Sequence, residues 1–302
     1  MKNTILKLAI SLSILSSSVL LSARAYAITI LQPGYKVDVI PTGNYSLQQP
    51  SGIAFDRNDN IYIADNLFDG TSRLLKIYPS GQVSQIVTFP TFIGGLATNK
   101  KGEIFGSLDN RTIFKLDKDV VTTFATDLPS GSAEKLTFDK RGNLYVAYFN
   151  AQAIAKISPK GEATIFVSNL GGPFAVAFKN NTLFIGDNSN FGAGPGEIKQ
   201  VTNQGNVTTF FSPLRNRVVD LEYNANQDSF FVAIQGGYSA NYGSEPAIDI
   251  IRNQQLTTFA TGFSEFPRDL KFDRKGNLYV VDNQKFYKIS PTLSIIKELP
   301  SK

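Results

Sequence analysis

The sequence predicts an all-β protein that folds as a six-bladed β-propeller with four-stranded antiparallel blades. One observation is a phrase of 14 or 15 residues that returns six times, at intervals of 40–49 residues. A second is that each repeat consists of short apolar runs separated by turns, without helical periodicity. The marker position of the phrase is occupied in turn by Phe55, Thr98, Phe138, Phe178, Tyr223 and Phe272.

Each repeat supplies four strand segments in a fixed order. The phrase holds the first two, joined by a polar turn such as residues 139–143, in which Gly142 provides the positive φ of a hairpin. The third strands are expected at residues 74–77, 113–116, 154–157, 197–201, 248–251 and 286–289. A fourth strand rich in Thr, Val and Phe, such as residues 120–124, completes each unit.

One strand precedes the first full repeat. Residues 35–40 resemble a fourth strand, and we expect them to pair with the last blade and close the ring, because closure removes an exposed sheet edge. The alternative is that they lie beside that blade as an additional edge strand.

Residues 1–27 have the three parts of a secretory signal peptide: Lys2 and Lys7, an apolar run over residues 8–21, and the small-residue site Ala25-Tyr26-Ala27. The run contains five serines and is shorter than the roughly 20 residues of a membrane span. We therefore expect a secreted or periplasmic protein, without a membrane anchor after cleavage, whose residues 28–302 form a single propeller domain.

Composition excludes several kinds of site. The chain has no Cys and no His, so a disulfide, a thiolate nucleophile, a Ser-His-Asp triad and a His-ligated metal are all ruled out. Its formal charge is +5, with 30 basic and 25 acidic residues; residues 1–27 contribute three of the basic residues and no acidic one. The remaining +2 charge is not clustered, so we expect no nucleic-acid partner, and we expect a monomer.

The long, irregular connections all fall on one side of the predicted propeller. They join the second strand to the third, or the fourth strand to the next repeat, whereas the turns on the opposite side are short. Two of them, residues 187–196 and 235–245, are rich in Asn, Gly and aromatic residues, which suit a small molecule, a glycan or a protein partner. The candidate ligand-binding residues are Asp187, Asn188, Asn190, Arg217, Tyr238, Tyr242, Glu245 and Arg268.

Carboxylates at the starts of the innermost strands are candidate ligands for a hard cation such as Ca²⁺. They are Glu134, Asp220 and Asp269, and the alternative is that they pair with neighbouring basic residues. The repeated pairs Asp65-Asn66, Asp109-Asn110, Asp187-Asn188 and Asp282-Asn283 follow second strands, and we interpret them as Asx turns that bond their own backbone rather than as metal ligands.

The phrases at residues 50–56 and 276–283 resemble NHL-type repeats and the six-bladed superfamily of SMP-30/gluconolactonase, streptogramin lyase and strictosidine synthase. The resemblance covers residues 34–302. It implies that metal ligands of a lactonase would occupy Ser51, Gly94, Glu134, Phe174, Val219 and Arg268, of which only Glu134 is a carboxylate. The His used by streptogramin lyases is missing, whereas Glu134 could correspond to the single channel Glu of a strictosidine-synthase-like enzyme.

Three functions follow as expectations. The first is a secreted binding module that acts through its loop-rich face and is not an enzyme. The alternative is a metal-dependent hydrolase or lactonase of the SMP-30 kind. A further alternative is an accessory protein of an exported biosynthetic pathway.

Overall fold

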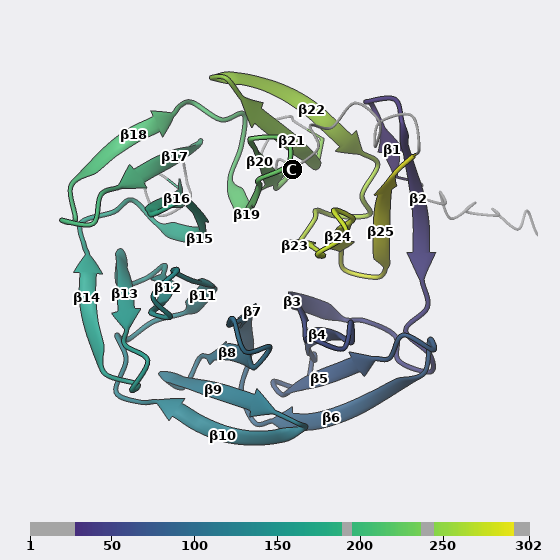
Figure 1. Ribbon diagram of the computed structural model, residues 1–302, viewed down its shortest axis with the longest axis horizontal. Helices are drawn as coiled ribbons and strands as arrows, with labels where there is room; N and C mark the ends of the chain where they lie inside the picture. The colour runs from purple at the N-terminus through teal and green to yellow at the C-terminus, as the bar shows by residue number, and fades with distance from the viewer. Residues whose placement is uncertain (1–27, 189–194, 237–244, 293–302) are drawn as a thin grey trace, which may run out of the picture.

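The computed structural model describes residues 28–188, 195–236 and 245–292, which form a ring of six antiparallel sheets (Figure 1). The first three blades follow the chain without interruption. Blade 1 is β3 (Gln49–Phe55), β4 (Ile61–Asn66), β5 (Ser72–Ile77) and β6 (Val83–Phe89). Blade 2 is β7 (Ile93–Thr98), β8 (Ile104–Leu108), β9 (Thr112–Asp117) and β10 (Val120–Ala125). Blade 3 is β11 (Ala133–Phe138), β12 (Leu144–Tyr148), β13 (Ala153–Ile157) and β14 (Ala163–Val167).

The other three blades continue the ring and bring the N-terminal strands into it. Blade 4 is β15 (Pro173–Lys179), β16 (Thr182–Asn188), β17 (Gly196–Val201) and β18 (Val207–Phe211). Blade 5 is β19 (Val218–Asn224), β20 (Ser229–Ile234), β21 (Ala247–Arg252) and β22 (Gln255–Thr261), with β1 (Thr29–Ile30) as a fifth strand. Blade 6 is β23 (Asp269–Phe272), β24 (Leu278–Val281), β25 (Phe286–Pro291) and β2 (Tyr35–Ile40).

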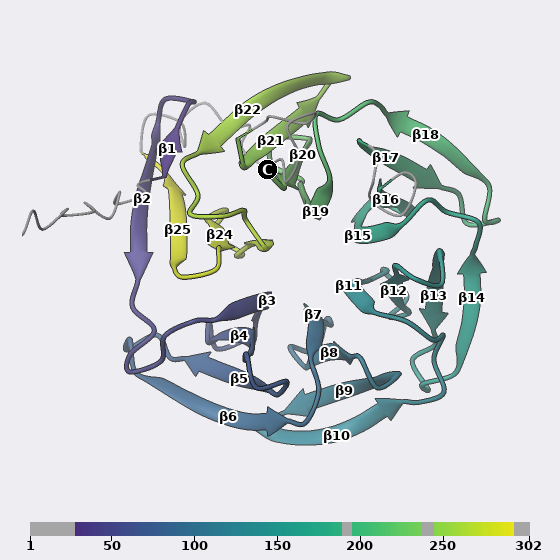
Figure 2. The ribbon, with the colours of Figure 1, turned by 180° about the vertical axis from the view of Figure 1, so that it is seen from behind.

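The predicted fold class is therefore confirmed, and so is closure of the ring by residues 35–40. Strand β2 pairs antiparallel with β25 in the register Tyr35↔Pro291 to Ile40↔Phe286 and forms the outer strand of blade 6. Figure 2 shows the same closure from behind, with β2 beside β25. The short strand β1 was not expected from the sequence. Within the described ranges there is no helix that could cross a membrane.

The hydrophobic core is divided among the six interfaces between neighbouring blades. Each interface has its own cluster of buried apolar side chains. The marker aromatics explain this division, because most of them contact an aromatic ring on the second strand of the preceding blade. Phe138 lies 5.0 Å from Phe105 between ring centroids, and Phe272 lies 5.0 Å from Phe231. The repeated aromatic is thus a contact between blades, and edge-on ring packing of this kind is favourable.

Three of the short turns between first and second strands are built around one aspartate. In blade 3, Asp139 Oδ1 accepts hydrogen bonds from the amides of Arg141 and Asn143, and Asp139 Oδ2 accepts one from the Asn143 side chain. Gly142 has φ 85° in this turn. Asp56 and Asp273 bind their own turns in the same way. These turns are therefore structural.

Candidate functional site

A β-bulge at the start of most inner strands directs one residue toward the channel mouth. The pairing of the first two strands shifts register between Pro50 and Gly52, and similar shifts occur in blades 2 to 5. A bulge inserts an unpaired residue and redirects its side chain. The six residues at this level all line one cavity: Ser51, Gly94, Glu134, Phe174, Val219 and Arg268.

This cavity has a volume of about 310 Å³ and lies at the mouth that carries the long connections. We call it the loop-side cavity. Its wall also includes Phe92, Phe266 and Arg217 from connections between blades, and Asp109 and Gln235 from the ends of second strands. Three phenylalanines, two arginines and two carboxylates thus face one small space. A concave site that combines apolar surface with a few converging polar groups is typical of small-molecule binding.

Glu134 has the most perturbed carboxyl group of this cavity. Burial raises its pKa to about 7; Lys135 and Arg217 act in the opposite direction, and Asp109 raises it further. Among the described residues, no hydrogen bond or ion pair reaches the Glu134 carboxyl group. Asp109 is exposed at the rim. Glu134 can therefore exchange a proton near neutral pH while facing the cavity.

Two arginines provide positive charge on the same wall. The guanidinium of Arg268 lies 4.8 Å from the Phe266 ring centroid and 3.7 Å from the Glu265 carboxylate. Arg268 Nε also donates a hydrogen bond to Asn283 Oδ1. Arg217 lies 5.9 Å from the Phe149 ring centroid. Burial lowers the pKa of the Arg217 guanidinium, and the charge of Glu134 opposes this effect.

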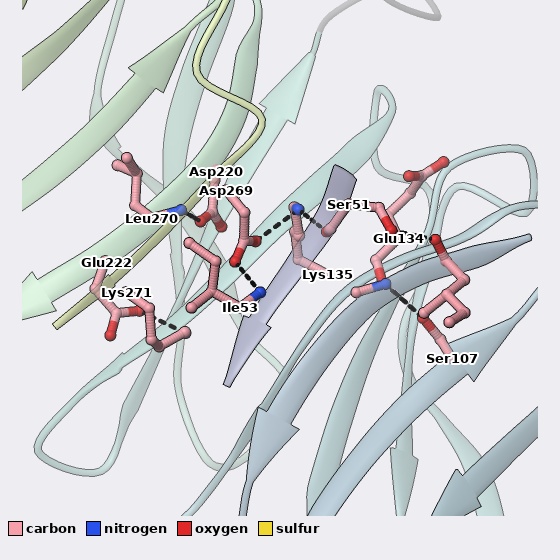
Figure 3. A network of polar contacts seen from close by, with 12 residues as sticks. Ser51, Ile53, Ser107, Glu134, Lys135, Asp220, Glu222, Asp269, Leu270 and Lys271 are labelled. Atoms are coloured by element: carbon pink, nitrogen blue, oxygen red, sulfur yellow. Dashed lines mark hydrogen bonds and ion pairs between the residues drawn. The ribbon is translucent and has the colours of Figure 1, made fainter. Parts of the chain in front are cut away.

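A buried charged network lies one residue deeper on the inner strands. Lys135 Nζ is 2.6 Å from Asp269 Oδ1 and donates a hydrogen bond to the Ser51 carbonyl (Figure 3). Asp269 Oδ2 accepts a hydrogen bond of 2.7 Å from the amide of Ile53. Asp220 Oδ2 accepts one of 2.7 Å from the amide of Leu270. Burial raises the pKa of Asp269 to about 7, and Lys135 opposes that shift.

The two aspartates occupy the same position in consecutive blades, and each binds the inner strand of the next blade. In blade 1 that position is Gly52, where an added Cβ would lie 2.7 Å from the Leu96 amide nitrogen. The glycine thus permits direct backbone approach between blades 1 and 2, whereas Asp220 and Asp269 fill the corresponding space between later blades. The structure separates the predicted metal trio accordingly, with Glu134 facing the cavity and the aspartates in the network below it.

Positive charges surround the three carboxylates that the sequence predicts as metal ligands. Lys135 already supplies a positive charge at Asp269, and Arg217 and Arg268 place two more at the mouth. Such cations oppose the binding of another. In the part of the chain that the structure describes, no group of three His, Cys, Asp or Glu side chains could hold a metal ion. Calcium binding by the trio stays a prediction from the sequence.

Asp187 and Asn188 hold the scaffold together. Asp187 accepts hydrogen bonds from the amides of Gly171 and Gly172 and lies 2.6 Å from Lys199 Nζ. Asn188 is fully buried and exchanges two hydrogen bonds with the main chain of Val218 in the next blade, at 2.8 and 3.0 Å. Neither lines the loop-side cavity.

The Asx-turn interpretation of the Asp-Asn pairs needs a partial correction. Asp282 does bind the amides of its own turn, at Gln284 and Lys285. Asp65 and Asp187 instead bind amides where the chain enters the inner strand of their own blade, because the second strand brings them beside that point. Asn66, like Asn188, binds the next blade, through Ile93.

The other predicted ligand-binding residues divide into three groups. Arg217 and Arg268 come together in the loop-side cavity, as expected for a shared site. Glu245 is exposed in the connection before β21 and does not line the cavity. Asn190, Tyr238 and Tyr242 lie outside the described residues.

Three residues that line the cavity are not among those predicted from the sequence. Phe92 and Phe266 belong to connections between blades, where the repeat gives no register. Asp109 could have been found by counting from the marker residue, since Asp109 follows Thr98 by the same interval as Asn66 follows Phe55. It therefore occupies the position of Asn66, and its carboxylate faces the cavity.

The opposite mouth of the channel has a second cavity of about 440 Å³, lined by the short turns. Several of its basic side chains donate hydrogen bonds to carbonyl groups of neighbouring blades. Arg274 donates to the Arg57 carbonyl at 2.9 Å, Arg57 donates to the Lys100 carbonyl, and Lys100 donates to the Lys140 carbonyl. These contacts link the turns of four successive blades, so the loop-side cavity is the stronger candidate.

Solved structures share this architecture at low sequence identity. A streptogramin B lyase aligns with 85% of this chain and 98% of its own, at a TM-score of 0.61 and 15% identity. A gluconolactonase from Xanthomonas campestris covers 85% and 90% with a TM-score of 0.68 and 12% identity. A calcium-binding protein, regucalcin, from Agrobacterium tumefaciens covers 85% and 94% with a TM-score of 0.66 and 15% identity. No family model and no curated protein matches the sequence. The similarity establishes the shared fold.

Proposed function

We propose that this protein binds a small organic molecule in the loop-side cavity. The observation that carries the proposal is the convergence of Glu134, Arg217 and Arg268 among three phenylalanine rings in a space of about 310 Å³. The rings can cover an apolar body, while the charged groups can orient polar atoms of the ligand. Many of the lining residues lie at the bulged starts of the inner strands, so much of the site is supported by the β-sheets.

A ligand screen with a blocked cavity tests the proposal. Ser132 lines the loop-side cavity, and Ser132→Phe would place a ring inside it. Thr137 lines the opposite cavity, so Thr137→Phe is the matched control. A compound that raises the melting temperature of the wild type and of Thr137→Phe, but not of Ser132→Phe, supports the proposal. Stabilising compounds that all remain effective on Ser132→Phe would contradict it.

Lactone hydrolysis is a second candidate function. It is favoured by the raised pKa of Glu134, a carboxyl group that faces the cavity and could transfer protons near neutral pH. The solved gluconolactonases are similar in fold alone. Turnover of a panel of lactones, with and without added Ca²⁺, Mg²⁺ or Mn²⁺, tests this function. Turnover that Glu134→Gln abolishes supports it, and turnover that the substitution leaves unchanged contradicts it.

The proposal includes export of the protein with removal of residues 1–27. The support is the basic start, apolar run and Ala25-Tyr26-Ala27 site of that segment. The N-terminal sequence of protein recovered from a bacterial periplasm or culture medium tests it. A chain that begins near Ile28 is the expected result, and an intact N-terminus in the cytoplasm would contradict it.

A further inference from the structure

Arg217 is a partly buried cation on the wall of the loop-side cavity. Its Nε is buried, and within the described residues it has no hydrogen-bond partner. No carboxylate of those residues lies within ion-pair distance of the Arg217 guanidinium, although Glu134 influences its pKa from farther away. A guanidinium has five N–H donors, and a buried donor without a partner is unfavourable.

Two other arginines, which stabilise the fold, each have a carboxylate partner. Arg73 donates to the Asp65 carboxylate through Nε and Nη2, the shorter contact being 2.8 Å. Arg215, two residues before Arg217, donates to both oxygens of Asp249 at 3.0 and 2.7 Å. In both cases the guanidinium donates two hydrogen bonds to the carboxylate of a buried aspartate. Arg217 has no such carboxylate partner among the residues that the structure describes.

The other residues of the cavity wall indicate what kind of ligand could supply a carboxylate to Arg217. Phe174 lines the loop-side cavity and packs edge-on against Phe149, the ring beneath Arg217, with centroids 6.3 Å apart. Phe92 and Phe266 add two further rings. An apolar body of about one aromatic ring could lie among these phenylalanines while its polar end reaches the guanidinium.

The charge of the cavity limits the ligand to a low negative charge. Arg217 and Arg268 are opposed by Asp109 and Glu134 on the same wall, and Lys135 at the floor of the cavity is neutralised by Asp269. Because these charges already balance in number, a phosphate or a dicarboxylate would add two negative charges, whereas a monocarboxylate adds one, which protonation of Glu134 offsets. A single carboxylate beside Arg217 fits, because carboxylates match the planar donor fork of arginine.

We infer that the ligand of the loop-side cavity is a small monocarboxylic acid with an aromatic or similarly compact apolar body, and that Arg217 binds its carboxylate. This inference rests on the proposed binding function and specifies its ligand class. Arg268 contributes a second positive charge, and the phenylalanines contact the apolar body.

Three probes of the same shape but different charge test the inference. Phenylacetate, phenylacetamide and phenethylamine are titrated into the protein by calorimetry at pH 7.5. Phenylacetate should bind about tenfold or more tightly than the amide, because only the acid pairs with a buried cation. Arg217→Met should remove this preference, because it weakens binding of the acid to about the affinity of the amide, while Arg217→Lys should retain part of the preference.

Arg274→Met is the matched control, because Arg274 is an exposed arginine at the opposite mouth. It should leave all three affinities unchanged, and the thermal unfolding of every variant establishes that it is folded. Equal binding of acid and amide, or a preference for the acid that survives Arg217→Met, overturns the ligand class. So does a lack of binding by all three probes. The proposed binding function is decided separately, by the screen with Ser132→Phe.

Discussion

Lys135 Nζ lies 2.6 Å from Asp269 Oδ1, and this ion pair joins blade 3 to blade 6 across the channel. Both side chains are almost completely buried. The pair lies at the floor of the loop-side cavity, because Lys135 lines that cavity together with Glu134 and Arg268, the neighbours of the two members in sequence. The floor of the candidate site is therefore also a connection between opposite sides of the ring.

Removal of one partner of this pair should be costly. Lys135→Met keeps the length of the side chain but leaves the Asp269 carboxylate buried without its cation, so we expect a loss of about 3–5 kcal/mol in the free energy of unfolding. Adding Asp269→Asn should recover part of the loss. Urea denaturation measures both, with Lys275→Met at an exposed site as the control. A loss below about 1 kcal/mol for Lys135→Met would contradict the buried pair.

The raised pKa of Glu134 predicts a pH-dependent effect on stability. Its pKa in the folded protein is about 7, above the ordinary 4.5, so its contribution to stability is present at low pH and is lost as the pH rises through this window. Glu134→Gln should therefore stabilise the protein by about 2–3 kcal/mol at pH 8.5 and have little effect at pH 4. Chemical denaturation at both pH values measures this, with the exposed Glu245→Gln as the control. An equal gain in stability at both pH values would contradict the raised pKa of Glu134.

Closure of the ring by β2 can be tested with two valines of that strand. Val37 packs against the cluster between blades 5 and 6, whereas Val39 is 59% exposed. Val37→Asp should lower the free energy of unfolding by about 2–3 kcal/mol, because it places a charge against buried apolar surface. Val39→Asp should change it by less than about 0.5 kcal/mol. Equal effects of the two substitutions would show that β2 does not pack as described.

Asn188 should be essential for stability rather than for ligand binding. Asn188→Leu removes both hydrogen bonds to Val218 and leaves its main-chain groups buried without partners, which should cost about 2–4 kcal/mol. The exposed Asn110→Leu is the control. Calorimetric titration of a ligand found in the screen completes the test. A stable Asn188→Leu protein that has lost ligand binding would favour the role expected from the sequence.

The repeat explains why the fold could be predicted and why much of the site could not. The phrase repeats because each inner strand makes the same contacts, as the marker pair Phe138 and Phe105 illustrates. The residues that line the candidate site are those that differ from one repeat to the next. Glu134 can be identified from the sequence because it is an unusual residue at a repeated position.

The role of Lys135 could not be read from the sequence. Its partner Asp269 belongs to a blade on the far side of the ring, and distances across a channel do not follow from strand order. For the same reason the sequence predicts Asp220 and Asp269 as metal ligands together with Glu134, although their carboxylates accept hydrogen bonds from the amides of Leu270 and Ile53.

The position of β2 has a consequence for the order of folding. Blades 1 to 4 each consist of four strands consecutive in sequence, so they can form from local contacts. Blade 6 needs both ends of the described chain: Thr292 donates a hydrogen bond to the Gly34 carbonyl, 258 residues away. Contacts between such distant segments form slowly, because a long loop must close first. We therefore expect ring closure to be the final and slowest step, and the edge of β25 to be exposed until it occurs.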